Sequence, residues 1–450
     1  MSQTKLATVV LAAGLGTRMR SATPKHLHPL LGRRLADWVV EAARGLGPDP
    51  LVVVTSPDAS DAFDGEGVTV AVQREPRGTG DAAAAARPSL DGFDGDVLVV
   101  TGDAATITTD LLERLLETHR AAEAAATVLS FEPAEPGAYG RIVRDGDGSL
   151  SAIVEARDAS EDELRIREVN SSIYVFDAAR LWPALERLEP NNAQGELYLT
   201  DTVRDLAAAG ERVAVYKAED PAEAEGVNTR AELAAAAAVL RDRINHEHML
   251  NGATIVDPAS TWIEPAVELE PDCTIHPFTL LKGETRVETG AEVGPHVVAV
   301  DSRIGPQALV GPFCYLRPGT VLESGAKAGA FVEIKNSRIG EGSKVPHQSY
   351  IGDADIGDGT NIGAGNITAN FSHQPGRPKG RTTIGHNVRT GVHNAFVAPV
   401  EIGDDAWIGA GSVITKDVPP ESLAVARARQ ETKEGYVRRK REREREREDD

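Results

Sequence analysis

The chain has few cysteines and no long apolar segment. Its 450 residues include only Cys273 and Cys314, which provide neither a disulfide framework nor a zinc-binding spacing and favour a reduced cytosol. No stretch reaches the roughly 20 apolar residues that span a bilayer. The first residues lack the long apolar core and the cleavage site of a signal peptide. We therefore expect a cytoplasmic protein that does not contact a membrane.

Positive charge and aromatic side chains are also scarce. Against 69 Asp and Glu stand 48 Lys and Arg, a formal net charge of -21 that argues against non-specific binding of nucleic acid. An anionic substrate would therefore need local basic clusters. The aromatic content of 4% is low, which favours an interior filled by aliphatic side chains.

The second half of the chain has an apolar residue at every sixth position. The series begins at Ile263, takes one five-residue step between Ala299 and Ile304, and ends at Ile414. A period of six fits neither an amphipathic helix nor an alternating strand. It is typical of a hexapeptide β-helix, in which short parallel strands stack their apolar residues inward. Such a rigid, flat-sided coil suits a trimer with clefts between its subunits.

The first half alternates strand-like and helix-like segments, which predicts βαβ units and a Rossmann-like α/β sheet. A long Ala-rich helix without Pro or Gly follows. We expect an α/β domain over residues 1–228, a linker helix over 229–250, a β-helix over 251–437 and a charged tail, solvated or disordered, over 438–450. The predicted parallel strands are 8–11, 51–55, 68–72 and 97–101, and the predicted helices are 36–43, 79–86 and 109–122.

A glycine-containing turn directly follows the first strand. Its glycines, Gly14 and Gly16, let backbone N–H groups approach a phosphate at the carboxyl edge of a parallel sheet. Arg18 and Lys25 add positive charge for a triphosphate. The glycines alone are equally consistent with a mere tight turn.

The longer segment LAAGLGTRM…PKHLHPL is more specific and resembles the signature of sugar-phosphate nucleotidyltransferases. This resemblance implies a Mg²⁺ site at Asp103 and Asn228, with Arg18 and Lys25 neutralising charge. The sugar phosphate is itself the nucleophile, so no protein base is required. The implied nucleotide- and sugar-binding residues are Leu11, Ala12, Ala13, Gly14, Gln73, Gly78, Thr79, Gly140, Glu155, Asn170 and Asn228.

The motifs after residue 310 extend the resemblance to almost the whole chain. Leu-Arg-Pro-Gly at 316–319, Glu-Ile-Lys-Asn at 333–336, His-Gln-Ser-Tyr at 347–350 and Asn-Ile-Gly-Ala-Gly at 361–365 follow in order. With the first half, they resemble the bacterial bifunctional N-acetylglucosamine-1-phosphate uridylyltransferase / glucosamine-1-phosphate N-acetyltransferase family. That family implies UTP and acetyl-CoA as co-substrates, a left-handed coil and a homotrimer.

The same resemblance implies roles in a second active site. His347 would be the general base, since imidazole titrates near neutrality. The amino sugar phosphate would contact Arg317, Lys335, Tyr350, Asn361 and Lys379. Acetyl-CoA would contact Ala364, Asn370, Phe371, Val392, Ala410 and Arg427.

Several positions depart from the family pattern. Gly-Asp-Val-Pro-Leu is replaced by Gly-Asp-Ala-Ala-Thr at 102–106, and Pro76 stands where a glutamine is expected. Asn-Thr-Gly is Asn-Ser-Ser at 170–172. In the second site this chain has Phe371 where the family has tyrosine and Val392 where the family has serine. The loop 372–381 is longer than usual.

Two alternatives remain open. In one, the α/β domain uses another sugar or nucleotide, as Pro76 and Ser171–Ser172 suggest, and the β-helix acetylates a different amino sugar. In the other, the β-helix is only a trimerisation scaffold for a nucleotidyltransferase. Two active sites agree best with both sets of motifs.

Overall fold

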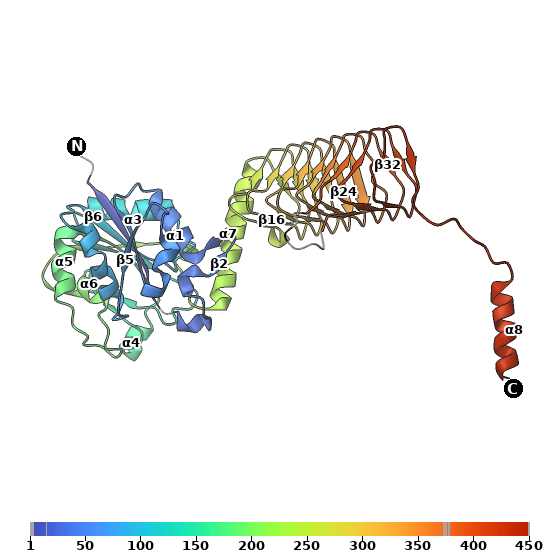
Figure 1. Ribbon diagram of the computed structural model, residues 1–450. Coiled ribbons are helices and arrows are strands. Elements are labelled where there is room, and N and C mark those ends of the chain that lie inside the picture. The colour runs from blue at the N-terminus through green and yellow to red at the C-terminus, as the bar shows by residue number, and fades with distance from the viewer. Residues whose placement is uncertain (1–3, 15, 372–375, 377–378, 449–450) are drawn as a thin grey trace. The chain divides into compact units, whose positions relative to one another are not determined.

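The computed structural model describes residues 4–14, 16–371, 376 and 379–448, and the chain divides into two compact units. The first unit covers Met1–Arg243 and the second Ile244–Asp450. Figure 1 shows an α/β domain in blue and green and a stacked coil of strands in yellow to red. No helix among the described residues is both long and apolar enough to span a membrane.

The first unit is built on a nine-stranded sheet whose main path has the order β11-β7-β10-β6-β1-β4-β5. Neighbouring strands are parallel from β6 to β5, and β11 is parallel to β7. The strands are β1 (Leu6–Ala12), β4 (Leu51–Thr55), β5 (Thr69–Val72), β6 (Asp96–Thr101), β7 (Ala126–Phe131), β8 (Arg141–Arg144), β9 (Leu150–Val154), β10 (Val169–Asp177) and β11 (Val213–Lys217).

The four predicted strands are parallel to one another, and one further strand of the sheet runs in the opposite direction. β10 lies between β6 and β7 and is antiparallel to both. The register between β10 and β7 shifts between Asn170 and Tyr174, and Ser172 in this bulge has a φ of 64°. A left-handed φ favours glycine, which is the residue of the family pattern at this position.

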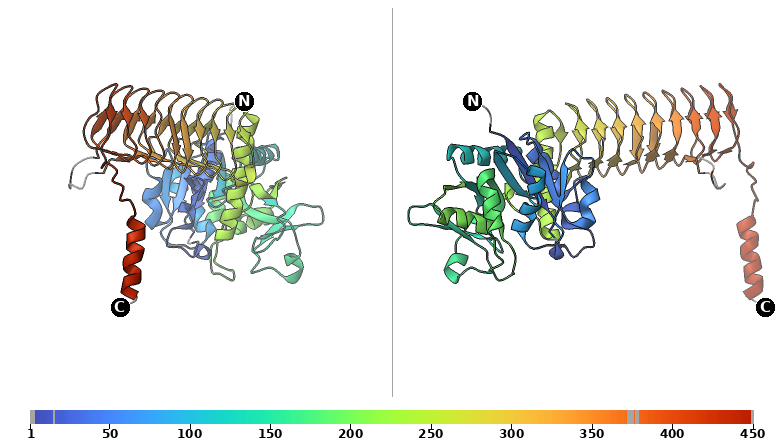
Figure 2. Two further views of the ribbon diagram at one scale, coloured as in Figure 1. Left: turned by 90° about the vertical axis from the view of Figure 1, so that its right-hand side faces the viewer. Right: turned by 60° about the vertical axis from the view of Figure 1, so that its left-hand side comes forward.

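Helices cover both faces of the sheet, as expected of a doubly wound fold (Figure 2). Alternate residues of β6 enter different apolar clusters, Val97 and Val99 on one face and Leu98 and Val100 on the other. Helices α2 (Thr79–Ala85), α5 (Ala178–Glu186) and α6 (Leu199–Ala208) pack on the first face. Helices α1 (Leu35–Arg44) and α3 (Thr109–Ala121) pack on the second.

The second unit is a coil of short parallel strands, which confirms the prediction from the six-residue period. Successive turns pair in register, as in Ile263↔Leu281↔Ala299↔Leu316↔Ile334. These five side chains are fully buried in one continuous apolar core. The three long sheets run from β12 (Thr254–Ile255) to β27 (Lys344–His347), from β13 (Trp262–Ile263) to β36 (Val413–Ile414), and from β14 (Glu268–Leu269) to β34 (Val400–Ile402).

Three α-helices remain among the residues that the structure describes, of which the shortest is α4 (Glu161–Leu164). Helix α7 (Arg230–Leu250) matches the predicted linker helix; Leu240 packs in the first unit, and Ile244 and Met249 pack against the β-helix core. Helix α8 (Tyr436–Glu448) forms the charged tail, and all its residues are exposed.

Candidate active sites

The glycine turn after β1 brings Lys25 against the end of the sheet. Gly16 has a φ of 59°, and a Cβ there would collide with the Cβ of Lys25. Short helices η1 (Thr17–Met19) and η2 (Lys25–Leu27) follow, and Lys25 is buried. The glycine therefore permits a close approach between the turn and the buried lysine. Leu15 lies outside the described residues.

Lys25 joins the two residues predicted to bind Mg²⁺. Its Nζ donates to the carboxylate of Asp103 and, at 3.1 Å, to Oδ1 of Asn228. Asp103 follows β6, and the N–H of Val227 donates to the carbonyl of Asp103 at 3.0 Å. Residues more than 100 positions apart in sequence thus place a carboxylate and an amide oxygen around one point.

The electrostatics keep Asp103 ionised. Burial acts to raise its pKa, but the Lys25 ammonium beside it outweighs burial, and the net pKa is lowered. The neighbouring His26 behaves oppositely: burial, helped by the Lys25 charge, lowers its pKa to about 4. His26 is therefore neutral at pH 7.

These residues fit a magnesium ion. Among the described residues no three His, Cys, Asp or Glu side chains gather as a metal cluster. Mg²⁺ commonly takes only one or two carboxylates and completes its shell with water and substrate phosphates. One ionised carboxylate and one amide oxygen meet that requirement, and the Lys25 ammonium, which contacts both, stands where the ion would bind.

A cavity of about 370 Å³ opens at this edge of the sheet and collects most of the predicted nucleotide-binding residues. Ala12 is buried in the sheet, and Arg18 is exposed; neither lines the cavity. The lining residues are Leu11, Ala13, Gly14, Thr17, Lys25, His26, Gln73, Pro76, Gly78, Thr79, Ala82, Thr101, Asp103 and Glu196.

One wall of the cavity presents a fixed amide. The Nε2 of Gln73 donates to the carbonyl of Gly78 at 3.1 Å and to Oδ2 of Asp81 at 2.9 Å. Both amide hydrogens are used, so Oε1 remains as an acceptor for a ligand. Gly78 has a φ of 119°, and a Cβ there would lie 2.5 Å from the Leu197 carbonyl oxygen. Only glycine fits this position.

The predicted sugar-side residues also meet. The N–H of Asn170 donates to the carbonyl of Gly140 at 2.9 Å, and a Cβ on Gly140 would lie 3.4 Å from Oε1 of Glu155. Burial raises the pKa of Glu155. The Asn170 side chain is held by Tyr174 and by the N–H of Ser172. The three predicted residues, Gly140, Glu155 and Asn170, do not line the nucleotide cavity.

In the β-helix, three predicted cations gather on one face. Arg317 follows β22 (Tyr315–Leu316), and Lys335 ends β25 (Glu333–Lys335), the next strand of the same sheet. Lys379 and then Arg317 lower the pKa of Lys335, as expected of adjacent like charges. Arg317 is itself paired with Glu333 at 2.9 Å. The cluster is a suitable anion site in a chain of high negative charge.

Tyr350 and Asn370 extend this face. Tyr350 begins β28 (Tyr350–Gly352), which pairs with β25, and the Asn370 amide lies 3.5 Å from its hydroxyl. The buried Asp353 accepts from both Asn370 and Asn336. Burial acts to raise the pKa of Asp353, but these amide hydrogen bonds and the two lysines outweigh it and lower the pKa.

His347 lies at the corner next to this face. It ends β27, is exposed, and pairs with Ala330. Asn361 lies elsewhere on the coil. Its backbone forms parallel β-bridges with Lys344 of β27 and with Arg389, so Asn361 continues the sheet that contains β27. Asn361 and Tyr350 thus belong to different faces of one coil. The loop 372–381 falls partly outside the described residues.

Four of the predicted acetyl-CoA residues, Ala364, Val392, Ala410 and Arg427, lie along one corner of the last turns, whereas Asn370 lies on the Tyr350 face. The His393 N–H donates to the carbonyl of Ala364 at 2.7 Å, and the Gly411 N–H donates to that of Val392 at 2.9 Å. A Cβ built on Gly391 would lie 2.5 Å from the backbone nitrogen of Ala410. A Cβ built on Gly411 would lie 3.7 Å from Cδ of Arg427. Phe371 is 69% exposed. The absence of a side chain at Gly391 therefore lets successive turns of the coil pack closely at this corner.

Sequence reasoning missed several features of these sites. His26 lines the nucleotide cavity, and Asp353 holds Asn336 and Asn370 together. A ladder of exposed rings also leads toward His347. It consists of Phe278, His296, Phe313 and Phe331, stacked with centroids 4.8 to 5.1 Å apart. These rings are 17 to 18 residues apart in the sequence, which is one full turn of the coil, and this spacing could have predicted the ladder.

The α/β domain with its cavity, joined to a hexapeptide coil, defines a nucleotidyltransferase fused to a hexapeptide-repeat acyltransferase. The MobA-like NTP transferase domain matches residues 8–206, and the hexapeptide repeat of succinyl-transferase matches residues 381–416. Over 97% of its length the chain is similar to proteins named bifunctional protein GlmU. Identity is 48% to that of Streptomyces coelicolor (94% of that protein covered), 48% to that of Kineococcus radiotolerans (92%) and 44% to that of Geotalea uraniireducens (99%). The chain belongs to the bifunctional GlmU family.

Proposed function

We propose that this enzyme makes UDP-N-acetylglucosamine in two steps at two separate sites. The β-helix transfers an acetyl group from acetyl-CoA to the amine of glucosamine 1-phosphate. The α/β domain then joins N-acetylglucosamine 1-phosphate to the uridylyl group of UTP and releases pyrophosphate. Such a product supplies peptidoglycan and other cell-envelope polymers. The observation that carries the proposal is the convergence of Lys25, Asp103 and Asn228 beside the nucleotide cavity.

In the uridylyl transfer the protein positions its substrates and offsets charge. A phosphate oxygen of the sugar phosphate attacks the α-phosphorus of UTP in line, and the bond to the pyrophosphate oxygen breaks. Lys25 and the backbone N–H groups of the glycine turn bind the phosphates. Gln73 presents its free oxygen to the imide N–H of uracil. Mg²⁺, held by Asp103 and Asn228, would neutralise charge on the phosphates.

In the acetyl transfer a base is required. Arg317, Lys335 and Lys379 hold the sugar phosphate, which brings the amine toward His347. The amine attacks the thioester carbonyl, His347 takes the amine proton, and coenzyme A leaves as the thiol. Arg427 contacts the phosphates of the coenzyme along the corner that ends near Gly411.

The working form is a homotrimer in the cytoplasm, with acetylation sites between subunits. The exposed ring ladder supports this arrangement, because Phe278 is 53%, Phe313 48% and Phe331 63% exposed in a single chain. Contiguous exposed apolar surface of this kind marks a contact with another protein. His347 lies beside the end of the ladder, since it pairs with Ala330, the residue before Phe331.

Mass spectrometry of the products tests the proposal. Purified protein is given UTP, Mg²⁺, acetyl-CoA and glucosamine 1-phosphate, and UDP-N-acetylglucosamine is expected. A second reaction replaces UTP with dTTP, because Pro76 lines the cavity at a position where the family pattern has glutamine. Preference for dTTP would favour the alternative nucleotide specificity. Absence of any acetylated product would favour the β-helix as a scaffold.

A further inference from the structure

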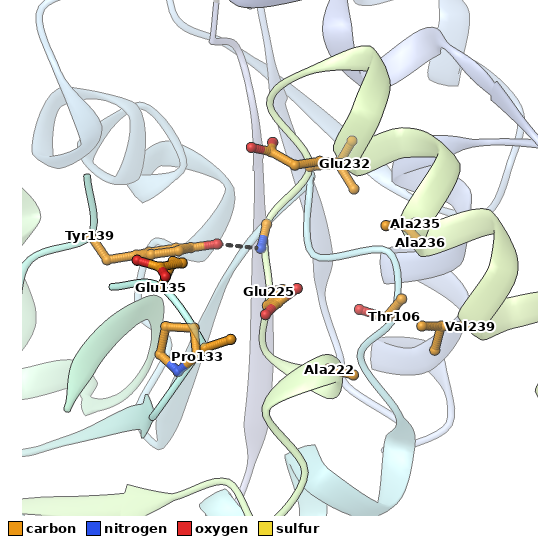
Figure 3. Close-up of a pocket in the computed structure, with 13 residues that line it drawn as sticks. Thr106, Pro133, Glu135, Tyr139, Ala222, Glu225, Glu232, Ala235, Ala236 and Val239 are labelled. Atoms are coloured by element: carbon orange, nitrogen blue, oxygen red, sulfur yellow. Dashed lines mark hydrogen bonds between the residues drawn. The ribbon is translucent and has the colours of Figure 1, made fainter. Parts of the chain in front are cut away.

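A second cavity, of about 280 Å³, lies in the α/β domain and shares no lining residue with the nucleotide cavity. Figure 3 shows Tyr139 and Pro133 on one side, helix α7 and Thr106 on the other, and Glu225 between them. Its size is at the small end of ligand pockets, which commonly measure roughly 300–1,000 Å³. The lining residues are Thr106, Pro133, Ala134, Glu135, Tyr139, Ala222, Glu225, Gly226, Val227, Glu232, Ala235, Ala236 and Val239.

The lining combines an apolar floor with negative charge. Pro133, Ala236 and Val239 supply apolar surface, and three carboxylates, Glu135, Glu225 and Glu232, are the only charged groups among the lining residues. Burial raises the pKa of Glu225, and the nearby carboxylates of Glu232 and Asp220 add to that rise. A positive charge placed here would be stabilised by groups that now repel one another.

Thr106 supplies an independent sign of a ligand. It is 3% exposed, and its hydroxyl oxygen is buried with no hydrogen-bond partner in the described part of the chain. Figure 3 shows this oxygen directed into the cavity, toward Ala222 and Glu225. A buried hydroxyl without a hydrogen-bond partner destabilises the folded state. The family pattern has leucine at this position, so the hydroxyl is a feature of this chain.

We propose that this cavity binds a small organic cation, an amine carrying a compact apolar group. The apolar group lies against Pro133, Ala236 and Val239, and the ammonium lies between Glu225 and Glu232 with one N–H donated to the Thr106 hydroxyl. Glu232 already accepts from the backbone N–H groups of Asn228 and Thr229 at 2.6 and 3.0 Å, but a neutral or anionic ligand would bring no positive charge to either carboxylate. The proposal concerns binding alone and holds whether or not the proposed function is correct.

Isothermal titration of the full-length protein with cyclohexylamine tests the site, with cyclohexanol as the neutral probe of similar shape. We expect saturable binding of one cyclohexylamine per chain and at least about tenfold weaker binding of cyclohexanol, the loss typical of a charge-assisted hydrogen bond. Equal affinities for the two probes, or no saturable binding of the amine, would overturn the proposal.

Three variants locate the bound amine. Thr106→Val keeps the shape of the side chain and removes only the hydroxyl, and Glu225→Gln removes one charge; each should weaken cyclohexylamine binding by at least about fivefold. Glu219→Gln changes a carboxylate that is 83% exposed and does not line this cavity, and its affinity should equal that of the unmodified protein. Circular dichroism confirms that each variant is folded. Unchanged binding in both cavity variants would place the amine elsewhere and refute the assignment.

Discussion

The ammonium of Lys25 and the carboxylate of Asp103 form an ion pair whose side chains are only 10% and 14% exposed. Lys25 is thus held at the point where the Asp103 carboxylate and the Asn228 amide oxygen meet. A buried charge needs a partner. The same three groups therefore stabilise the fold and provide the charges that a triphosphate and its metal require.

Replacement of Lys25 tests this double role. Lys25→Met should lower uridylyl transfer by roughly 10²–10³-fold, the usual loss when one preorganised charge is removed from a transition state. It should also lower the free energy of unfolding by about 3–5 kcal/mol, because Asp103 loses its partner. Coupled assays and urea denaturation measure the two effects. Lys217→Met, which removes an exposed lysine paired with Glu132, is the matched control and should change neither. Near-normal uridylyl transfer in Lys25→Met would contradict the assigned role.

His26 predicts a specific pH dependence of stability. Its pKa is about 4 in the folded protein against 6.5 in the unfolded chain, so between these values the unfolded state binds more protons. The neutral imidazole of His26 therefore does not reduce the free energy of unfolding above pH 6.5. As the pH falls from 6.5 toward 4, the free energy of unfolding falls by on the order of 3 kcal/mol because of this residue. Urea unfolding at several pH values should show a shallower decline in His26→Gln. His246→Gln, on exposed helix α7 surface, controls for loss of a histidine. Parallel declines in the unmodified protein and His26→Gln would refute the assignment.

Val392 provides a test in which activity improves. The family pattern has serine here, and Val392 is 44% exposed at the corner predicted to hold acetyl-CoA. Val392→Ser should lower the KM for acetyl-CoA by roughly two- to tenfold, equivalent to one hydrogen bond of about 0.5–1.5 kcal/mol. Uridylyl transfer should not change. Val413→Ser, at an exposed position on another face of the coil, should leave the KM as it is. A higher KM in Val392→Ser would count against the predicted coenzyme corner.

The ring ladder predicts the effect of a charge on assembly. Phe313→Glu places a carboxylate between His296 and Phe331, so a trimer that buries the ladder should dissociate, and acetyl transfer should fall with it. Light scattering after size-exclusion chromatography measures the assembly. Leu164→Glu, at an exposed position of the α/β domain, should remain trimeric. An intact trimer in Phe313→Glu would place the interface on another surface.

The sequence predicted the β-helix well because its signal is local and repeated. The apolar period from Ile263 to Ile414 reflects side chains that must enter one narrow core, and each turn repeats the same requirement. The four parallel strands predicted around β1 also agree with the structure to within two residues. Strand direction is not local: the segment that forms β10 reads as an apolar strand, but nothing in it specifies antiparallel pairing with β6 and β7.

Site residues were predictable from the sequence when they belong to a motif of several residues in a fixed order. Lys25, Asp103 and Asn228 were each named from their motifs, and the fold brings them together. Contacts that depend on packing were not predictable. Thr106 was noted only as a departure from a pattern, and its buried hydroxyl became visible with the cavity around it.

The most direct test of two independent sites is to measure both half-reactions in two variants, Asp103→Asn and His347→Ala. Asp103→Asn should lose uridylyl transfer and retain acetyl transfer. His347→Ala should lose acetyl transfer by roughly 10²–10⁴-fold, the contribution typical of a general base, and retain uridylyl transfer. His276→Ala, another histidine of the β-helix, is the control for the second variant. Loss of both activities in either folded variant would contradict the account.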